Sequence, residues 1–275
     1  MRVVLVLSAL LASEVLHAQA GFDDVLGQAS SPPAMEVQWG RHAAQRAELY
    51  LPRQAIDSPL IVLIHGGCWL SDFDMAYMRP MAEALSAQGR TVWSLSYRRL
   101  GHDVHPAREG LQDLLTAIGR LADWTPGDVD ARAPVWLVGH SAGGHLALLA
   151  AAELGPERVA GVIGLAAITD LADYAADEGS CNQAAARLLD GSEADSRLSP
   201  IHRLPLGVRQ VLAQGEQDTI VAARQAERHV SAARAAGDSA ELLMMESAGH
   251  FEPVIVDSPA FGEWTQHLPP LPGID

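Results

Sequence analysis

Hydrophobic residues along the chain form short, mostly apolar runs separated by longer stretches of helical periodicity. The apolar runs predict strands at Leu60–Ile64, Thr91–Tyr97, Pro134–Gly139, Val159–Ile168, Arg209–Gln214 and Glu241–Met245. Apolar residues that recur every three or four positions predict helices at Met75–Ala87, Ala107–Ala122, Ala142–Leu154, Val221–Ala236 and Pro259–His267. Apolar strands that alternate with helices indicate a parallel sheet covered on both faces. We therefore predict one α/β domain over residues 36–275.

Three segments depart from this alternation. Glu36–Leu51 alternates polar and apolar residues, which predicts an antiparallel hairpin at the edge of the sheet. Residues 21–35 are polar and rich in proline and serine, and we expect a flexible lead-in there. Asp170–Pro200 is acidic and partly helical, and is too long for a structureless loop, so residues 170–200 are expected to form a small lid.

The first twenty residues have the three parts of a secretory signal peptide. Arg2 supplies the positive charge, Val3–Leu11 the apolar core, and residues 18–20 (Ala-Gln-Ala) the cleavage site. The alternative is a buried N-terminal helix, which Glu14 favours. We expect export to the periplasm or the exterior. The apolar core is too short to span a membrane.

Composition narrows the class of protein. Of the 275 residues, 48% are hydrophobic and 19% charged, as in soluble globular proteins. The net charge of −15 argues against a nucleic-acid partner, whose binding needs clustered cations. The sequence contains arginine but no lysine. This excludes an enzyme with a Schiff-base lysine, a GKS/GKT phosphate-binding loop, or a Ser-x-x-Lys acyl-transfer site. The sequence also lacks a G-x-G-x-x-G loop after a strand, and its two cysteines are too few for structural zinc, so we expect neither cofactor nor metal.

A serine between small residues stands where an apolar strand meets a helix. Residues 139–143 read GHSAG, which fits the G-x-S-x-G pattern of a nucleophile elbow. The turn of such an elbow is so sharp that Gly139 and Gly143 are needed to avoid clashes. The alternative is a serine that only caps the helix. In its strand–turn–helix context, Ser141 is predicted to be a nucleophile.

A second glycine motif, HGGCW, follows the strand Leu60–Ile64. Consecutive glycines allow the main chain to aim amide groups at one point, and together with the amide of Ala142 they would form an oxyanion hole. We therefore expect Gly66, Gly67 and Ala142 to surround a developing oxyanion. An ordinary glycine turn after a strand is the alternative.

A serine nucleophile needs a base, and the chain offers eleven histidines. His250 follows the last predicted core strand and so lies at the sheet edge where the serine should project. We expect His140 and His145 to point away from Ser141 because the turn is tight, and His229 to lie on a solvated helix face.

The base in turn needs an orienting carboxylate. Asp218 follows the strand Arg209–Gln214 and precedes a helix, which places it one strand before His250. Glu216 and Asp170 are alternatives, and Asp218 could equally cap the helix. The chain order Ser141, Asp218, His250 is the one expected for this architecture.

Taken together, these motifs resemble the α/β-hydrolases, most closely the esterase and arylformamidase-like group whose oxyanion loop reads HGG-x-W. The resemblance runs from about Ser58 to Trp264 through HGGCW, GHSAGGH, LSP, GEQD and AGHF. It implies an α/β-hydrolase fold with a mostly parallel sheet, and catalytic roles for the residues proposed above. Cys68 stands where the hormone-sensitive-lipase-like pattern has a third glycine, so substrate preference does not carry over from that branch.

The predicted activity is hydrolysis of a small-molecule carboxylic ester through an acyl-enzyme, without a cofactor. An arylformamidase that cleaves N-formylkynurenine is the alternative enzyme, although export weighs against it because that substrate is made inside cells. A catalytically silent binding protein on the same fold is a third hypothesis. Oligomeric state and acyl-chain preference do not follow from the sequence.

Two further expectations concern the surroundings of the glycine loop. Trp69 either walls the acyl pocket or belongs to the core. Cys68 and Cys181 either form a disulfide that pins the lid to the active site or remain as two buried thiols.

Overall fold

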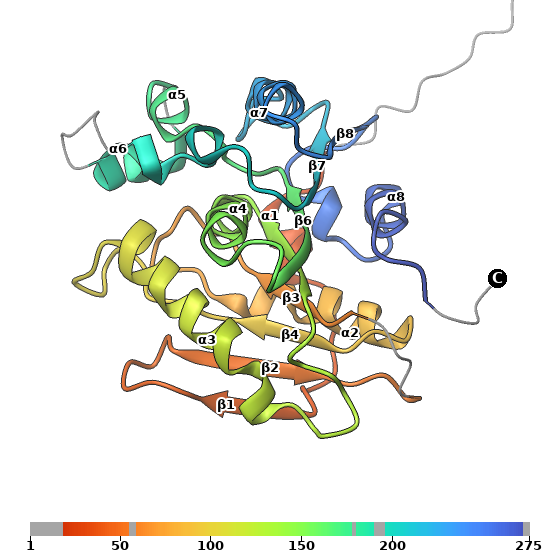
Figure 1. Cartoon of the computed structure of the whole chain (residues 1–275). Coiled ribbons are helices and arrows are strands. Elements are labelled where there is room, and N and C mark those ends of the chain that lie inside the picture. Colours follow the sequence, from red (N-terminus) through yellow and green to blue (C-terminus); the bar gives the residue numbers. More distant parts are fainter. Residues whose placement is uncertain (1–18, 55–58, 178–179, 190–195, 272–275) are drawn as a thin grey trace, which may run out of the picture.

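The computed structural model describes residues 19–54, 59–177, 180–189 and 196–271. Most of the predicted signal peptide, residues 1–18, therefore lies outside the described residues. Eight strands form one sheet in the order β1-β2-β4-β3-β5-β6-β7-β8, stacked from bottom to top in Figure 1. The strands are β1 Met35–Gln38, β2 Arg46–Tyr50, β3 Ile61–Ile64, β4 Val92–Leu95, β5 Val135–His140, β6 Val159–Leu165, β7 Arg209–Gly215 and β8 Ala240–Met245.

Helices cover both faces of this sheet, as predicted. They are α1 Phe22–Leu26, α2 Arg79–Ala87, α3 Leu111–Trp124, α4 Ala142–Leu154, α5 Leu171–Ala175, α6 Ala184–Leu189, α7 Arg224–Ala235 and α8 Pro259–Thr265. One core cluster joins the sheet to α3, α4 and α7, and a second joins it to α1, α2 and α8. Within β3, Val62 and Ile64 face the first cluster and Ile61 and Leu63 the second, because successive side chains of a strand alternate between faces.

The pairing of the strands matches the hydrophobic pattern. The hairpin predicted at Glu36–Leu51 is the antiparallel pair β1–β2, which continues antiparallel onto β4. From β4 to β8 every neighbouring pair is parallel. Since parallel strands carry their carboxyl ends to one edge, the loops that follow β3, β5, β7 and β8 lie on the same side of the sheet.

The flexible lead-in expected at residues 21–35 is wrong. Residues 22–26 form α1, and β1 begins at Met35. Val25 is only 1% exposed within the second core cluster. Although the segment is mostly polar, the apolar side chains of Phe22 and Val25 pack against the second core cluster and hold this one-turn helix to the domain.

The described parts of the insertion at residues 170–200 are largely helical, as expected, and they pack into the core of the domain. Leu171 and Tyr174 of α5, and Ala184 and Leu188 of α6, are buried in the first core cluster. Asp170 caps α5 by accepting from the amides of Ala172 and Asp173. Residues 178–179 and 190–195 of this insertion lie outside the described residues.

Two predicted helices begin differently from the pattern. The chain enters α3 through a wider, π-helical turn at Pro106–Gly110. The helix expected from Val221 begins at Arg224, because the amides of Ile220 and Val221 bond to the Asp218 carboxylate instead. No helix within the described part of the chain is long and apolar enough to span a membrane.

Candidate active site

Ser141 occupies the turn between β5 and α4 in a backbone conformation that non-glycine residues rarely adopt. Its φ is 56° and its ψ is −121°, and its amide donates to the carbonyl of Leu165 at 2.8 Å. A Cβ atom on Gly139 would overlap the backbone of Gly143, and one on Gly143 would overlap the carbonyl oxygens of Ile64 and His65. The small residues therefore let β5, α4 and the loop after β3 approach closely around the serine.

His250 and Asp218 come from neighbouring strand ends and are hydrogen-bonded. The Nδ1 atom of His250 lies 2.8 Å from Oδ2 of Asp218, and these side chains are 6% and 0% exposed. Since Nδ1 is engaged by the carboxylate, Nε2 is the nitrogen left to accept a proton. The structure thus places Asp218 beside the imidazole, whereas Asp170 caps α5 and Glu216 is exposed.

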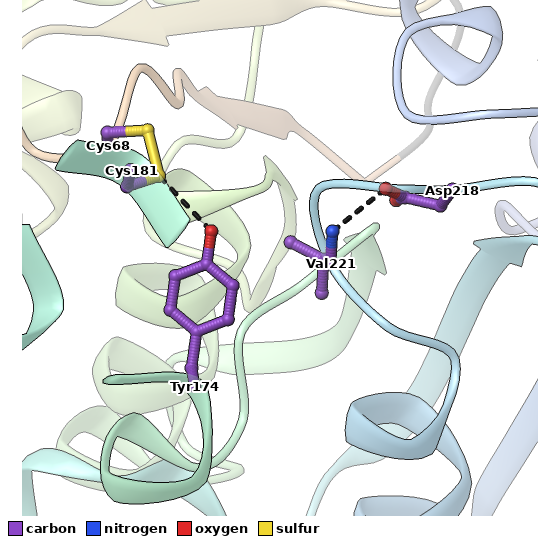
Figure 2. Close-up of a disulfide and its surroundings, with 5 residues drawn as sticks. All are labelled: Cys68, Tyr174, Cys181, Asp218 and Val221. Atoms are coloured by element: carbon purple, nitrogen blue, oxygen red, sulfur yellow. Dashed lines mark hydrogen bonds between the residues drawn. A yellow bond between two sulfur atoms is a disulfide. The ribbon is translucent and has the colours of Figure 1, made fainter. Parts of the chain in front are cut away.

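Asp218 is held in its ionised form. Burial alone would raise its pKa, but the hydrogen bond and charge of His250 and the amides of Val221 and Ile220 outweigh it. The pKa of Asp218 is therefore below its usual range. Both amides donate to Oδ1 at 2.8 Å, and Figure 2 shows the bond from Val221. Oδ2 also accepts from Gln214 Nε2 at 3.1 Å, which leaves the carboxylate fixed toward the imidazole.

The glycine loop after β3 differs from the expectation at one position. The amide of Gly66 donates to the hydroxyl of Tyr77 at 2.6 Å. An N–H group has one hydrogen to donate, so the expectation that Gly66 contributes its amide to an oxyanion hole is wrong. A Cβ atom at Gly66 would lie 2.6 Å from the carbonyl oxygen of His140 and 3.1 Å from Cβ of Ser141. Gly66 therefore serves close approach of the loop to the elbow.

Of the other two residues expected around the oxyanion, Gly67 lines the cavity with Ser141 and Ala142 follows Ser141 in the chain. Gly67 has a φ of 96° and Cys68 a φ of 55°, so the chain turns left-handed and both residues line the cavity beside Ser141. The carbonyl of Gly67 closes the turn by accepting from the amide of Leu70 at 2.9 Å. Ala142 is the first residue of α4, and a first helical amide has no acceptor within its own helix. Ala142 adjoins Ser141 in the chain, and Gly67 and Cys68 line the same cavity as Ser141, so their amides are the candidate donors to an oxyanion.

Tyr77 and His140 connect the glycine loop to the histidine loop. His140 Nε2 lies 3.0 Å from the carbonyl oxygen of His250, which can only accept, so Nε2 carries a hydrogen. Burial, together with the nearby His250, lowers the pKa of His140 to about 3, so its Nδ1 is unprotonated and accepts from the Tyr77 hydroxyl at 3.0 Å. The Tyr77 oxygen in turn accepts the amide of Gly66. Every proton in this chain of hydrogen bonds is accounted for.

His65 supports the glycine loop from beneath. Its Nδ1 donates to the carbonyl of Gly66 at 2.8 Å, and its Nε2 accepts from the guanidinium of Arg99 at 2.9 Å. The ring stacks on Tyr97, whose hydroxyl donates to the carbonyl of His65. Burial and the adjacent Arg99 lower the pKa of His65 to about 3, so the ring stays neutral with this arrangement of hydrogens.

A cavity of about 240 Å³ opens above these groups. Ser141, His250 and His140 line it, and the other side chains around it are mainly aromatic and aliphatic. The apolar side chains that line it are Phe22, Phe73, Tyr77, Ile220 and Phe251. A larger hollow of about 410 Å³ along residues 122–132 contains no histidine among its described lining residues, and so lacks a base for a nucleophile.

Trp69 does not wall this cavity, so the pocket role considered for it is wrong. The side chain is fully buried in the first core cluster, where its Nε1 donates to His145 Nδ1 at 3.3 Å. His145 points away from Ser141 as expected, and its Nε2 donates to the carbonyl of Leu198. His229 was expected in solvent but is fully buried against Gln210.

A disulfide joins the glycine loop to the insertion. Cys68 and Cys181 are bonded across 113 residues, and the hydroxyl of Tyr174 donates to the sulfur of Cys181 at 3.2 Å (Figure 2). Cys68 lines the cavity, but no described residue between 170 and 200 does. The insertion therefore fastens the loop from the side, and the expectation of a lid over the cavity is wrong for the part of it that the structure describes.

Six residues that line the cavity were missed by reasoning from sequence. Two of them are His140 and Ile220, and the other four are aromatic: Phe22, Phe73, Tyr77 and Phe251. His140 was expected to point away from Ser141, but it lines the same cavity. Its place beside Ser141 in the sequence, and those of Phe251 beside His250 and Ile220 near Asp218, could have drawn attention to these three, whereas nothing in the local pattern distinguishes the others from core residues. Within the described ranges there is no group of histidine, cysteine or carboxylate residues that could hold a metal ion.

Comparison with known proteins places this geometry in a family. The model of the BD-FAE family matches residues 47–232. A protein of Oryza sativa subsp. japonica named probable isoprenylcysteine alpha-carbonyl methylesterase is 23% identical over 250 residues, which are 80% of this chain and 58% of that protein. The chain thus spans little more than half of that relative.

Solved structures share the fold. Esterase B from Lactobacillus Rhamnosis superposes with a TM-score of 0.74 at 22% identity, covering 89% of this chain and 87% of the other. The butyrate-bound form of Est2, a thermophilic esterase from Thermogutta terrifontis, gives a TM-score of 0.63 at 24% identity, covering 81% and 86%. The chain belongs to the BD-FAE family and has the α/β-hydrolase fold.

Proposed function

We propose that this protein is a serine hydrolase of small carboxylic esters. The observation that carries the proposal is the His250–Asp218 hydrogen bond at the cavity that Ser141 lines. A serine hydroxyl becomes a nucleophile when an imidazole removes its proton, and the imidazole works when a carboxylate holds its tautomer. The esterase names of the relatives and structural neighbours support the same activity.

The proposed reaction has two halves. His250 Nε2 takes the Ser141 proton while the oxygen attacks the ester carbonyl, and the amides of Gly67, Cys68 and Ala142 hold the oxyanion. The tetrahedral intermediate collapses with loss of the alkoxide, which receives the proton from His250, and an acyl-serine remains. Water then loses a proton to His250 and attacks the acyl carbonyl; as this intermediate collapses, His250 returns the proton to the Ser141 oxygen and the acid is released. Each oxyanion donor contributes about 2.7–4 kcal/mol to transition-state stabilisation.

The substrate proposed is an uncharged ester with a small acyl group. The cavity is lined by apolar side chains and holds about eight water-sized groups, at about 30 Å³ for each. Est2 binds butyrate in a structure of the same fold, which supports a short aliphatic acid. A nucleic-acid partner does not fit the net charge of −15.

The test combines labelling with hydrolysis. A fluorophosphonate probe should label the wild type, and labelling and p-nitrophenyl butyrate hydrolysis should both vanish in Ser141→Ala. Ser71→Ala, which changes a serine outside the cavity lining, is the matched control and should keep both. An unlabelled wild type would favour a silent binding protein. Activity on N-formylkynurenine far above that on the butyrate ester would favour an arylformamidase.

We also propose that the protein is exported and processed after Ala20. The disulfide supports an oxidising compartment, because such bonds persist outside the cytosol. N-terminal sequencing of protein recovered from the periplasm or medium should begin at Gly21. Recovery of the intact N-terminus from the cytosol alone would contradict this proposal.

A further inference from the structure

The N-terminal segment brings an aromatic ring to the cavity from more than one hundred residues away. Phe22, the first residue of α1, lines the cavity that contains Ser141. Its ring centroid lies 5.3 Å from that of Phe73, 5.6 Å from Tyr77 and 5.8 Å from Phe251. Edge-to-face and tilted packing at these distances is favourable for aromatic rings. Phe22 therefore completes an aromatic wall to which two other segments contribute, the one between β3 and α2 and the loop after β8.

This position is held by contacts on both sides of Phe22. Val25 is buried in the second core cluster. The side chain of Gln28 donates to the carbonyl of Val254 at 3.1 Å and accepts from the amide of Val256 at 2.8 Å. The amide of Gly21 donates to Asp24 at 2.8 Å. All these contacts survive cleavage after Ala20, so a processed chain keeps Phe22 in the wall.

The residues just before Phe22 add contacts to the loops that carry the proposed base and acid. Gln19 Nε2 donates to the carbonyl of Gln217, next to Asp218, at 2.7 Å. The amide of Ala20 donates to Glu252, which also accepts the amide of Gly249 beside His250. In the uncleaved chain the segment thus crosses the same loops, and after cleavage the contacts of Gly21, Val25 and Gln28 hold Phe22 in position.

Among the aromatic residues of the wall, Phe22 is the one whose ring is separable from the chemistry. Phe73 packs against Gly67, and a Cβ atom on that glycine would overlap it. Tyr77 holds the amide of Gly66. Phe251 packs edge-on against His250 at 5.0 Å. Changing any of these three would disturb the glycine loop or the base, whereas the ring of Phe22 packs against the other wall residues and the second core cluster.

We propose that Phe22 sets the length of the acyl chain that the enzyme accepts, and that the substrates are linear acyl esters of up to about six carbons. This inference rests on the proposed esterase function. Of about eight groups that fit in 240 Å³, the carbonyl carbon and two ester oxygens take three, which leaves room for about five further carbons. Phe22 is half-buried, so removing its ring opens the cavity toward solvent and admits longer chains.

The experiment measures kcat/KM for p-nitrophenyl esters of two to twelve carbons. The wild type should be most active at four to six carbons and fall steeply beyond. Phe22→Ala should move the optimum to eight carbons or more. Each additional buried methylene changes kcat/KM by about fourfold, so two of them raise the octanoate-to-butyrate ratio by about fifteenfold. Phe22→Trp should lower the butyrate-to-acetate ratio.

Leu26→Ala is the matched control. Leu26 lies on the same short helix but is 58% exposed, so its removal changes α1 without changing the wall. Its chain-length profile should equal that of the wild type. An unchanged octanoate-to-butyrate ratio in Phe22→Ala, or an equal shift in Leu26→Ala, would overturn the proposal. If Phe22→Ala melts well below the wild type, Phe22→Leu serves in its place and should give a smaller shift in the same direction.

Failure of the esterase function can be told apart from failure of this inference. A wild type that hydrolyses none of the esters contradicts the proposed function. The wall is then tested by calorimetric titration with butyrate and octanoate, which needs no catalysis. Octanoate affinity that rises in Phe22→Ala but not in Leu26→Ala supports the length limit, and equal affinities in all three proteins refute it.

Discussion

Replacing Cys68 and Cys181 together by serine removes the covalent link between the glycine loop and the insertion. The double substitution leaves no unpaired thiol, because these are the only two cysteines. Serine is close to cysteine in size, so packing around α5 and α6 should change little. The hydrogen bond from Tyr174 to the sulfur of Cys181 can be replaced by one to a serine hydroxyl. The main effect should therefore fall on the unfolded chain.

The size of the effect follows from the 113 residues between the cysteines. In the chain-entropy description, closing a loop of that length removes about 16 cal/mol/K from the unfolded state. This corresponds to about 4.8 kcal/mol at 25 °C, near the upper end of measured disulfides. For a domain of this size, about 2 °C of melting temperature corresponds to each kcal/mol, so the expected decrease is about 10 °C.

The assay is guanidinium unfolding followed by tryptophan fluorescence and by circular dichroism, with thermal melting alongside. The oxidised wild type is compared with the double variant and with wild type in dithiothreitol. The reduced wild type should match the variant, and the variant should not respond to dithiothreitol. Coincidence of the two optical transitions checks that unfolding is two-state, which the free-energy comparison requires.

A decrease below about 1 kcal/mol, or below about 2 °C, would refute the reasoning. It would mean that the insertion and the glycine loop remain close in the unfolded chain, so that the disulfide restrains little there. A decrease far above 5 kcal/mol would contradict it as well, because the loss would then come from the folded state. Far-ultraviolet circular dichroism of the native variant would show such a loss of helix.

Three further predictions concern the site and its surroundings. Asp218→Asn should lower kcat by about 10³–10⁴-fold with unchanged circular dichroism, because an amide favours the wrong imidazole tautomer; a loss under tenfold would contradict the assigned role. Tyr77→Phe should lower kcat more than it raises KM, and should lower the free energy of unfolding in urea by about 1–3 kcal/mol. The reason is that the Gly66 amide and His140 Nδ1 both lose their hydrogen-bond partner. An unchanged kcat and free energy of unfolding would contradict the chain of hydrogen bonds. The third concerns four buried histidines whose pKa values lie at about 3 to 4: His65, His140, His145 and His229. Since their unfolded pKa is 6.5, the unfolded chain binds more protons as pH falls below that value, and the free energy of unfolding should decrease by up to about 1.4 kcal/mol per histidine per pH unit between pH 6.5 and 4. Urea midpoints that are flat from pH 7 to 5 would contradict this.

Much of the fold was predictable because it depends on local pattern. Strands β3 to β8 lie within two or three residues of their predicted bounds, and the hairpin at the N-terminal edge was also predicted. Mostly apolar strands that alternate with helices are typical of a parallel sheet that is covered on both faces. Contact between the loops of Asp218 and His250 follows from the same topology, since both follow parallel strands that end at one edge.

Predictions failed where a side chain's role depends on a partner from a distant element. Gly66 lies in a glycine motif that predicts an oxyanion donor, yet its amide donates to the hydroxyl of Tyr77. Trp69 adjoins the glycine loop but points into the core. Phe22 lies in a segment whose composition suggested flexibility and yet walls the cavity.

The sequence alone therefore determined the sheet, the sharp turn at Ser141, and the chain order in which Ser141, Asp218 and His250 follow the strands. It could do so because hydrophobic periodicity and small side chains act on neighbouring residues along the chain. Only the tertiary structure decided which amides remain available, where the insertion packs and what closes the cavity. Those outcomes depend on packing between elements far apart in sequence, and many arrangements of the same aromatic and polar residues satisfy the local pattern equally well.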